Sequence, residues 1–330
     1  MTKLTLLLTA AAATACTAST AAPKGSDDNR PLGPISWTID GLDRRDDGKV
    51  QLGFRTGEGS RNNSHWSNGY DLVELEGLAS GQLNGASQPA RFSLNREAGR
   101  LDCAGTVGNG QGAGTCSFAP DSAFAGRLAA AGIGRPTGRQ AYDLTLAKVR
   151  YDLVEELTRQ GYDKPTVSDL VGLGIHGATA GYVREIADAG YRFGKVDGLV
   201  QFRIFGINGR FIGDMAAIGP QFRALSPEDL VQFKIFKVQP ELVRAYTRLG
   251  YPAINARDLV AMQIHGVSPD FVTDLAALGY RNVPTRKLVE LRIHGVTADF
   301  IRDLKGEGVA LPSPDQLVRL RLAGYRPGNR

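Results

Sequence analysis

The sequence predicts an α+β protein in two parts, a small antiparallel β domain followed by an α-solenoid of 29-residue two-helix repeats. Two observations predict this class. Short segments within residues 35–120 alternate apolar and polar residues, as strands with one buried face do. Residues 139–330 carry one apolar pattern seven times at a nearly constant interval, which is typical of a repeat array.

The composition is that of a folded, soluble protein. Hydrophobic residues make up 42% of the 330 residues and charged residues 22%. The 39 basic and 34 acidic residues leave a formal charge of +5. A balance this close describes a well-solvated surface and does not by itself indicate nucleic acid or anionic lipid as a partner.

Residues 1–15 have the pattern of an export signal. Lys3 supplies the positive charge, and the apolar run that follows it is shorter than the roughly 20 residues that cross a bilayer. Residues 16–34 are polar and rich in proline and glycine, which predicts a flexible tether. The sequence therefore predicts an extracytoplasmic protein.

Two processing routes fit the end of this signal. Ala13-Thr14-Ala15 suits cleavage by a signal peptidase, which would release a periplasmic or secreted protein. Residues 13–16 also resemble a bacterial lipobox, with Ala13 in place of the preferred leucine and Cys16 as the lipidated residue. On this second route the protein is an outer-membrane lipoprotein, and a lipid on Cys16 is its only membrane contact.

Residues 35–120 predict an antiparallel sheet. Clusters of glycine, asparagine and serine separate its alternating segments. The apolar residues expected on the buried face are Ile35, Trp37, Ile39, Val50, Leu52, Phe54, Ala90, Phe92 and Leu94.

A glycine-rich hairpin is the most specific local signal of this domain. Asn109-Gly110 is a preferred two-residue turn, because both positions need positive φ. Cys103 and Cys116 are equidistant from it, so they lie opposite one another at a non-hydrogen-bonded pair, where a disulfide can form. A disulfide agrees with export and leaves Cys16 free. The glycines could instead suggest a dinucleotide-binding loop, but that loop needs a following helix, and here a strand follows.

Residues 121–131 read as a helix and residues 132–138 as a linker, after which the repeats begin. One apolar residue per repeat, called here the anchor, aligns the units at intervals of 29 residues, with 31 in the third interval. A glycine follows each of the first six anchors by 15 residues, where it suits the left-handed position that ends a helix. The anchors are Leu146, Ile175, Ile204, Ile235, Ile264, Ile293 and Leu322.

Each repeat reads as a first helix that ends near the anchor and a second helix that ends near this glycine. Expected N-caps of first helices are Thr166, Ser226, Asn255 and Ser313, and those of second helices are Thr179, Asn208, Ser268 and Thr297. Helices of about ten residues are marginal alone in water, so they must stack on neighbouring repeats. Six complete units and a terminal first helix are predicted.

Three histidines, His176, His265 and His294, occupy the position after the anchor. Equivalent positions in successive repeats are at least one helix–helix distance apart, roughly 8–10 Å, so the three cannot ligate one metal ion. A place near the C-terminal end of a helix, where the dipole favours a cation, explains them. We find no motif of a hydrolase, metalloprotease or redox enzyme, and the sequence predicts no cofactor.

Two other functions remain open. The repeat turns are similar to helix-hairpin-helix elements, which bind nucleic acid through backbone amides, and the C-terminal end of the array is rich in arginine and lysine. Export argues against a nucleic-acid partner, and residues such as Thr297 and Ser268 replace the second glycine of that element. An enzyme with an unrecognised site in the β domain is the second alternative.

The units IHGVSPDFVTDLAALGY and IHGVTADFIRDLKGEG (residues 264–280 and 293–308) resemble repeats appended to bacterial antirepressor metallopeptidases of the β-lactam-sensor type. The segment TCSFAPDSAF also resembles the part that accompanies those repeats. The peptidase helix and the membrane segments of that family are absent from this chain. The resemblance implies a stand-alone sensory or scaffolding module. We therefore expect an exported, non-enzymatic protein whose helical repeats bind a protein or a component of the cell envelope.

Overall fold

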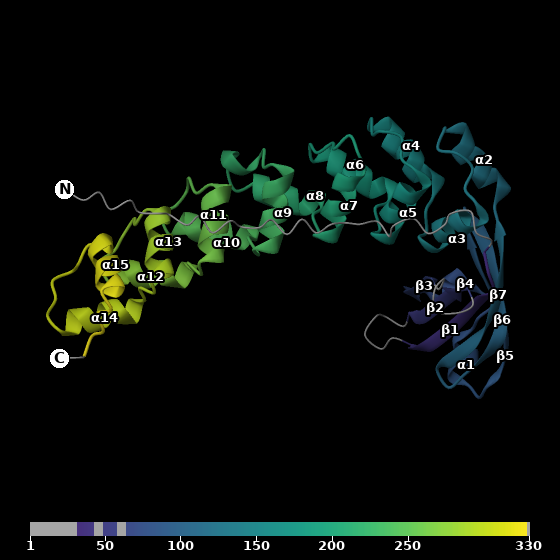
Figure 1. Cartoon of the computed structure of the whole chain (residues 1–330), viewed down its shortest axis with the longest axis horizontal. Helices are drawn as coiled ribbons and strands as arrows, with labels where there is room; N and C mark the ends of the chain where they lie inside the picture. Colours follow the sequence, from purple (N-terminus) through teal and green to yellow (C-terminus); the bar gives the residue numbers. More distant parts are fainter. Residues whose placement is uncertain (1–31, 43–48, 58–63, 329–330) are drawn as a thin grey trace, which may run out of the picture.

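The computed structural model describes residues 32–42, 49–57 and 64–328. It is an elongated molecule with a curled antiparallel sheet at one end and a rod of helices that runs from the sheet to the C-terminus (Figure 1). The two-part α+β class is confirmed. The predicted export signal, Cys16 and most of the tether lie outside the described residues.

The sheet has seven strands in the order β3-β2-β1-β7-β6-β5-β4, and every neighbouring pair is antiparallel. Only Asp71 and the short 3-10 helix η1 (Leu72–Glu74) separate β3 from β4, although these strands form opposite edges of the sheet. The sheet must therefore curl until its two edges approach one another. Its strands are β1 (Ile35–Leu42), β2 (Val50–Thr56), β3 (Ser64–Tyr70), β4 (Leu75–Glu76), β5 (Gln88–Arg96), β6 (Gly99–Gly108) and β7 (Gln111–Pro120).

The concave face of the sheet holds the core of the β domain. All nine apolar residues predicted for this face are buried. Trp37 lies at the centre, with its ring edge-on to Phe92 at a centroid distance of 5.0 Å. Burial on one face thus follows from the two-residue alternation of the strands.

The β6–β7 hairpin has the predicted register. Asn109 and Gly110 adopt φ values of 52° and 79° in the turn. Cys103 and Cys116 are paired residues, 4.1 Å apart at Cα, and a disulfide joins them. The glycines of these strands have a packing role, because a Cβ on Gly105 or Gly114 would lie 2.7 Å from the Trp37 ring. They leave room for the indole, which accounts for a strand so rich in glycine.

Helix α3 (Gly138–Leu146) joins the two parts of the molecule. Its Tyr142 and Leu146 belong to the core of the sheet, whereas Leu144 belongs to the core of the array. Helix α1 (Ser80–Asn84) flanks the sheet at β6, and α2 (Ser122–Ala130) packs on the array. Phe124 of α2 packs on Tyr151, the first residue of the helix α4 (Tyr151–Arg159), with ring centroids 6.4 Å apart, so α2 covers the end of the array that faces the β domain.

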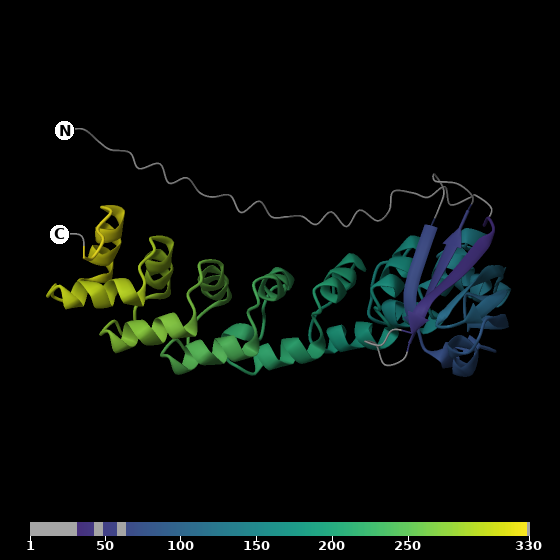
Figure 2. The same ribbon diagram turned by 90° about the horizontal axis from the view of Figure 1, so that it is seen from below.

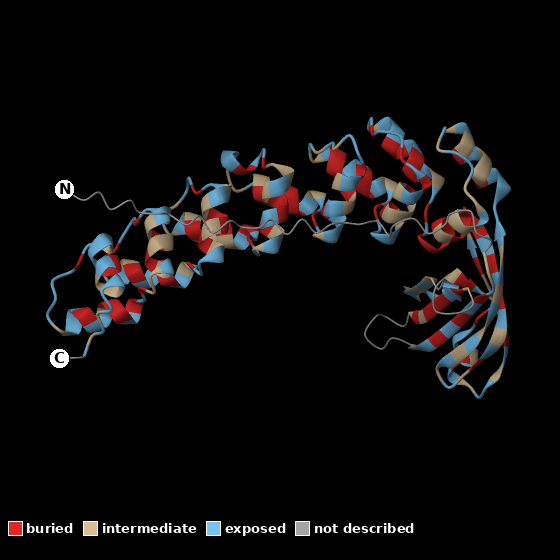
Figure 3. Ribbon diagram, in the orientation of Figure 1, coloured by how far each residue is buried: buried red, intermediate tan, exposed pale blue. Residues whose placement is uncertain are grey.

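The array consists of six helix pairs and a final helix, as predicted. The second helices form one layer and the first helices another, and one apolar core runs between them (Figures 2 and 3). The first helices are α3, α5 (Val167–Ile175), α7 (Asp197–Ile204), α9 (Pro227–Ile235), α11 (Ala256–Ile264), α13 (Thr285–Ile293) and α15 (Pro314–Leu322). The second helices are α4 (Tyr151–Arg159), α6 (Ala180–Asp188), α8 (Gly209–Ala216), α10 (Pro240–Arg248), α12 (Pro269–Ala277) and α14 (Ala298–Gly306).

The predicted helix ends are confirmed with one exception. All eight expected N-caps accept a hydrogen bond from the amide three residues further on. Five of the six glycines that follow second helices have positive φ. For Gly219 the prediction was wrong: its φ is 179°, because the two-residue insertion forms the 3-10 helix η2 (Pro220–Phe222) and the chain enters it extended.

Neighbouring repeats are linked through the loops that follow second helices. The Tyr191, Tyr251 and Tyr280 hydroxyls each donate to a backbone carbonyl in the next such loop, at 2.8, 2.8 and 2.6 Å. Burial raises the pKa of all three hydroxyls. These bonds repeat along the array and fix each loop on its neighbour.

Candidate binding surface of the repeat array

The anchors form an exposed apolar row along the array. Although they define the apolar period of the sequence, six of the seven lie outside the core. Their exposed fractions are 54% for Ile175, 46% for Ile204, 49% for Ile235, 53% for Ile264, 55% for Ile293 and 67% for Leu322. These six residues are called the anchor row below.

Helix geometry explains this exposure. In α11, Leu259 and Met262 are fully buried, and Ile264 follows Met262 by two residues. Residues two apart on an α-helix point about 200° away from each other, so the core cannot hold both. This offset is visible in the sequence and could have identified the row.

The first anchor behaves differently from the others. Leu146 is only 1% exposed, because the β sheet packs against the end of α3. It occupies the same position as Ile175 in the next repeat, which is 54% exposed and has no comparable neighbour within the described chain. The anchor position is therefore one that another surface can cover.

The three histidines do not form a site together. His176, His265 and His294 are each the C-cap residue of a first helix, directly after the anchor. Within the described ranges, no group of three or more histidine, cysteine, aspartate or glutamate side chains could hold a metal ion. The histidines instead lie beside the anchor row, each in a different repeat.

Several cations near the row already pack within the array. The Arg203, Arg292 and Arg321 guanidinium groups, one residue before their anchors, lie 4.8, 5.1 and 4.9 Å from an aromatic ring of the preceding second helix. Arg203 also donates from Nε to the His176 carbonyl oxygen at 2.9 Å. Part of the basic character of the array thus stabilises repeat stacking.

The amides of the turn between the two helices are also engaged. Gly177 donates to the Gly174 carbonyl oxygen at 3.0 Å, and Ala178 to that of Leu173 at 2.8 Å. The Tyr182 amide donates to the N-cap Thr179. A helix-hairpin-helix element presents amides of its turn to phosphate, and these three amides are bonded within the repeat instead.

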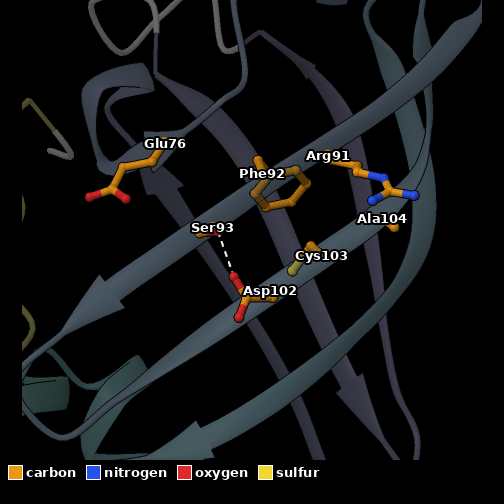
Figure 4. A pocket seen from close by; sticks show the side chains of 7 residues that line it. All are labelled: Glu76, Arg91, Phe92, Ser93, Asp102, Cys103 and Ala104. Atoms are coloured by element: carbon orange, nitrogen blue, oxygen red, sulfur yellow. Dashed lines mark hydrogen bonds between the residues drawn. The ribbon is translucent and has the colours of Figure 1, made fainter.

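The β domain carries a shallow depression of about 310 Å³ on the outer face of β4, β5 and β6 (Figure 4). Ser93 donates to the Asp102 carboxylate at 2.7 Å, and Arg100 donates to the same oxygen at 2.8 Å. These two bonds, first that from Ser93, lower the pKa of Asp102. Glu76 and Arg91 point in different directions (Figure 4). Among the residues that line the depression, the Asp102 carboxylate is therefore held by Ser93 and Arg100.

Comparisons of the chain with known protein families, with curated proteins and with solved structures find no match. Among the described residues, none of the helices combines the length and the apolar character needed to cross a bilayer. The anchor row, with its six exposed apolar side chains, is the candidate binding surface of the described chain.

Proposed function

We propose that this protein is an exported, non-enzymatic binding or scaffolding protein whose anchor row contacts another protein. The observation that carries the proposal is the exposure of six apolar side chains at equivalent positions of successive repeats. Monomeric soluble proteins rarely expose large apolar patches, and those that exist often bind a partner.

The energetics of the row favour binding over a large area. Fully burying an isoleucine contributes roughly 1.5–3 kcal/mol, so covering the exposed half of one contributes about 1 kcal/mol. No single anchor could hold a partner, but six in one row could. The sensory or scaffolding role implied by the resemblance to antirepressor-associated repeats belongs to this proposal.

Site-specific photocrosslinking in intact cells tests the binding surface. A photoreactive phenylalanine analogue at Ile264 should give a distinct protein adduct, whereas the same residue at Ala277, exposed at the far end of α12, should not. Nuclease treatment should leave the adduct unchanged. Equal labelling from both positions, or an adduct that nuclease removes, would contradict the proposal.

Fractionation with intact-mass analysis tests export. A mature chain that starts at Cys16 with a lipid mass supports the lipoprotein route, and an unmodified chain cleaved after Ala15 supports the soluble route. A full-length chain in the cytoplasm would refute the extracytoplasmic assignment.

A further inference from the structure

We infer that the partner covering the anchor row is a second copy of this chain, placed antiparallel and face to face about a two-fold axis. This inference rests on the proposed function, because it names the occupant of the same surface. In this arrangement Ile204 faces Ile293 of the other copy and Ile235 faces Ile264. The axis passes between α9 and α11.

Spacing is the first argument. A row with one apolar residue per repeat needs a partner with the same period if every anchor is to be covered. A second copy has that period by construction. The two extra residues of the long interval lie in η2 and its loop, outside the helices, so they do not break the row.

Charge complementarity is the second and stronger argument. The residue seven positions before each anchor lies on the same side of its helix, two turns earlier. In the four central helices, Asp197 and Glu228 hold this position in α7 and α9, whereas Arg257 and Arg286 hold it in α11 and α13; the outer helices α5 and α15 have Ser168 and Asp315 there. All four central residues are exposed, and within the described part of the chain none of them makes an ion pair.

The antiparallel arrangement pairs these charges with opposite signs. When Ile204 faces Ile293, Asp197 faces Arg286, and Glu228 faces Arg257 in the same way. A parallel arrangement, with the two-fold axis along the rod, places each helix against the same helix of the other copy. It therefore offers none of these charges a partner of opposite sign. The two-fold axis generates each of these two pairs twice, which gives four opposite-charge contacts across the interface.

The local structure does not explain these arginines. Arg257 and Arg286 lie in the first turns of α11 and α13, where the helix dipole disfavours a cation. Asp197 and Glu228, in the first turns of α7 and α9, follow the usual preference. A carboxylate from a second copy would offset the unfavourable position of the arginines.

The residue after the anchor gives a third correspondence. The histidine of the repeat pattern is replaced by phenylalanine at two positions, Phe205 and Phe236. In the antiparallel register Phe205 faces His294, and Phe236 faces His265. The two phenylalanines thus place an aromatic ring opposite each of these histidines, whereas His176 faces Ala323.

The area available is compatible with a stable dimer. Six half-exposed side chains of roughly 100 Å² each give on the order of 600 Å² of apolar surface per copy, which is at the upper end for one patch on a monomer. Typical stable interfaces bury about 800 Å² per partner. The charged residues along the same helices supply the remaining area.

Sedimentation velocity on the mature chain tests the dimer. The wild-type protein should sediment as a dimer at micromolar concentration. Ile235→Asp with Ile264→Asp should weaken association at least about 100-fold. Circular dichroism should show the same helical content, because both positions are half-exposed.

Charge reversal distinguishes dimerisation in this register from non-specific hydrophobic association. Arg257→Glu with Arg286→Glu should weaken the dimer about 10-fold or more, and adding Asp197→Arg with Glu228→Arg should restore it. Arg248→Glu, on the exposed end of α10, is the matched control and should change nothing. A monomeric wild type, or a dimer that these reversals leave unchanged, would overturn the inference.

Cysteine crosslinking gives an independent reading of the register. In a Cys16→Ser background, a chain with both Ile235→Cys and Ile264→Cys should form a covalent dimer under mild oxidation, and each single variant should form far less. Efficient dimers from the single variants would contradict the antiparallel register. A monomeric wild type that still gives a distinct adduct from Ile264 in cells would keep the proposed function and refute this inference alone.

Discussion

The residue two positions after each anchor has a left-handed backbone conformation, which favours glycine. Adding a side chain there and removing one should therefore change the stability of the array in opposite directions. This residue adopts positive φ in every repeat and is glycine in five, including Gly206 at 63°. Lys148 and Lys237 adopt the same conformation at 57° and 56°. We expect Gly206→Ala to destabilise the array and Lys237→Gly to stabilise it.

The magnitude follows from two opposing terms. A left-handed conformation costs a residue with a Cβ roughly 1–2 kcal/mol, and glycine loses about 0.5–1 kcal/mol through its greater freedom in the unfolded chain. The difference is about 1 kcal/mol. Packing does not complicate the test, because a Cβ on Gly206 would meet no atom within 4 Å.

Chemical denaturation followed by far-ultraviolet circular dichroism measures both changes. Gly213→Ala is the control, since this glycine lies exposed inside α8 with open space around it and without positive φ. Alanine there should stabilise the helix by about 1 kcal/mol. If Gly206→Ala also stabilises the protein, the left-handed position does not limit stability and the reasoning fails.

Three further predictions concern other contacts. Reducing the disulfide between β6 and β7, whose cysteines are 13 residues apart, should cost the β domain about 3 kcal/mol, and an unchanged melting temperature would contradict this. Tyr280→Phe removes the donor to the Pro312 carbonyl oxygen and should cost about 1 kcal/mol, with faster amide exchange in α15 as its signature. Arg184 donates to Glu156 at 2.8 Å and, as the largest cause, lowers the pKa of that carboxyl. The stabilisation from this carboxylate is therefore complete above its unfolded pKa and is lost as the pH falls through the lower folded pKa. Glu156→Gln should flatten the pH dependence of unfolding below about pH 5, and an identical pH profile would refute it.

Local rules predicted most of the fold. The register of the β6–β7 hairpin follows from Asn109-Gly110 alone, because one preferred turn fixes every pair in the ladder. The helix ends follow from N-caps and glycines for the same local reason. Gly219 departs from the pattern because the following proline and the insertion form a 3-10 turn, which a periodic alignment does not reveal.

The apolar period alone did not predict the candidate site, because a residue can repeat for two different reasons. Positions with the same residue type in every repeat are constrained either by the core or by a surface that repeats with them. Met262 and Ile264 are both apolar, yet one is fully buried and the other is 53% exposed. Only their separation of two residues tells them apart.

The deviations from the period are the more informative part of the array. Stacking requires every repeat to be alike, so a position whose charge changes sign between α9 and α11 is not determined by stacking. Glu228 and Arg257 are such a pair, and both are exposed. A helix dipole would select an acid at both positions. From α7 to α13, the change of sign at the middle of the rod is what a two-fold axis at that point would match, since each acid then faces a base.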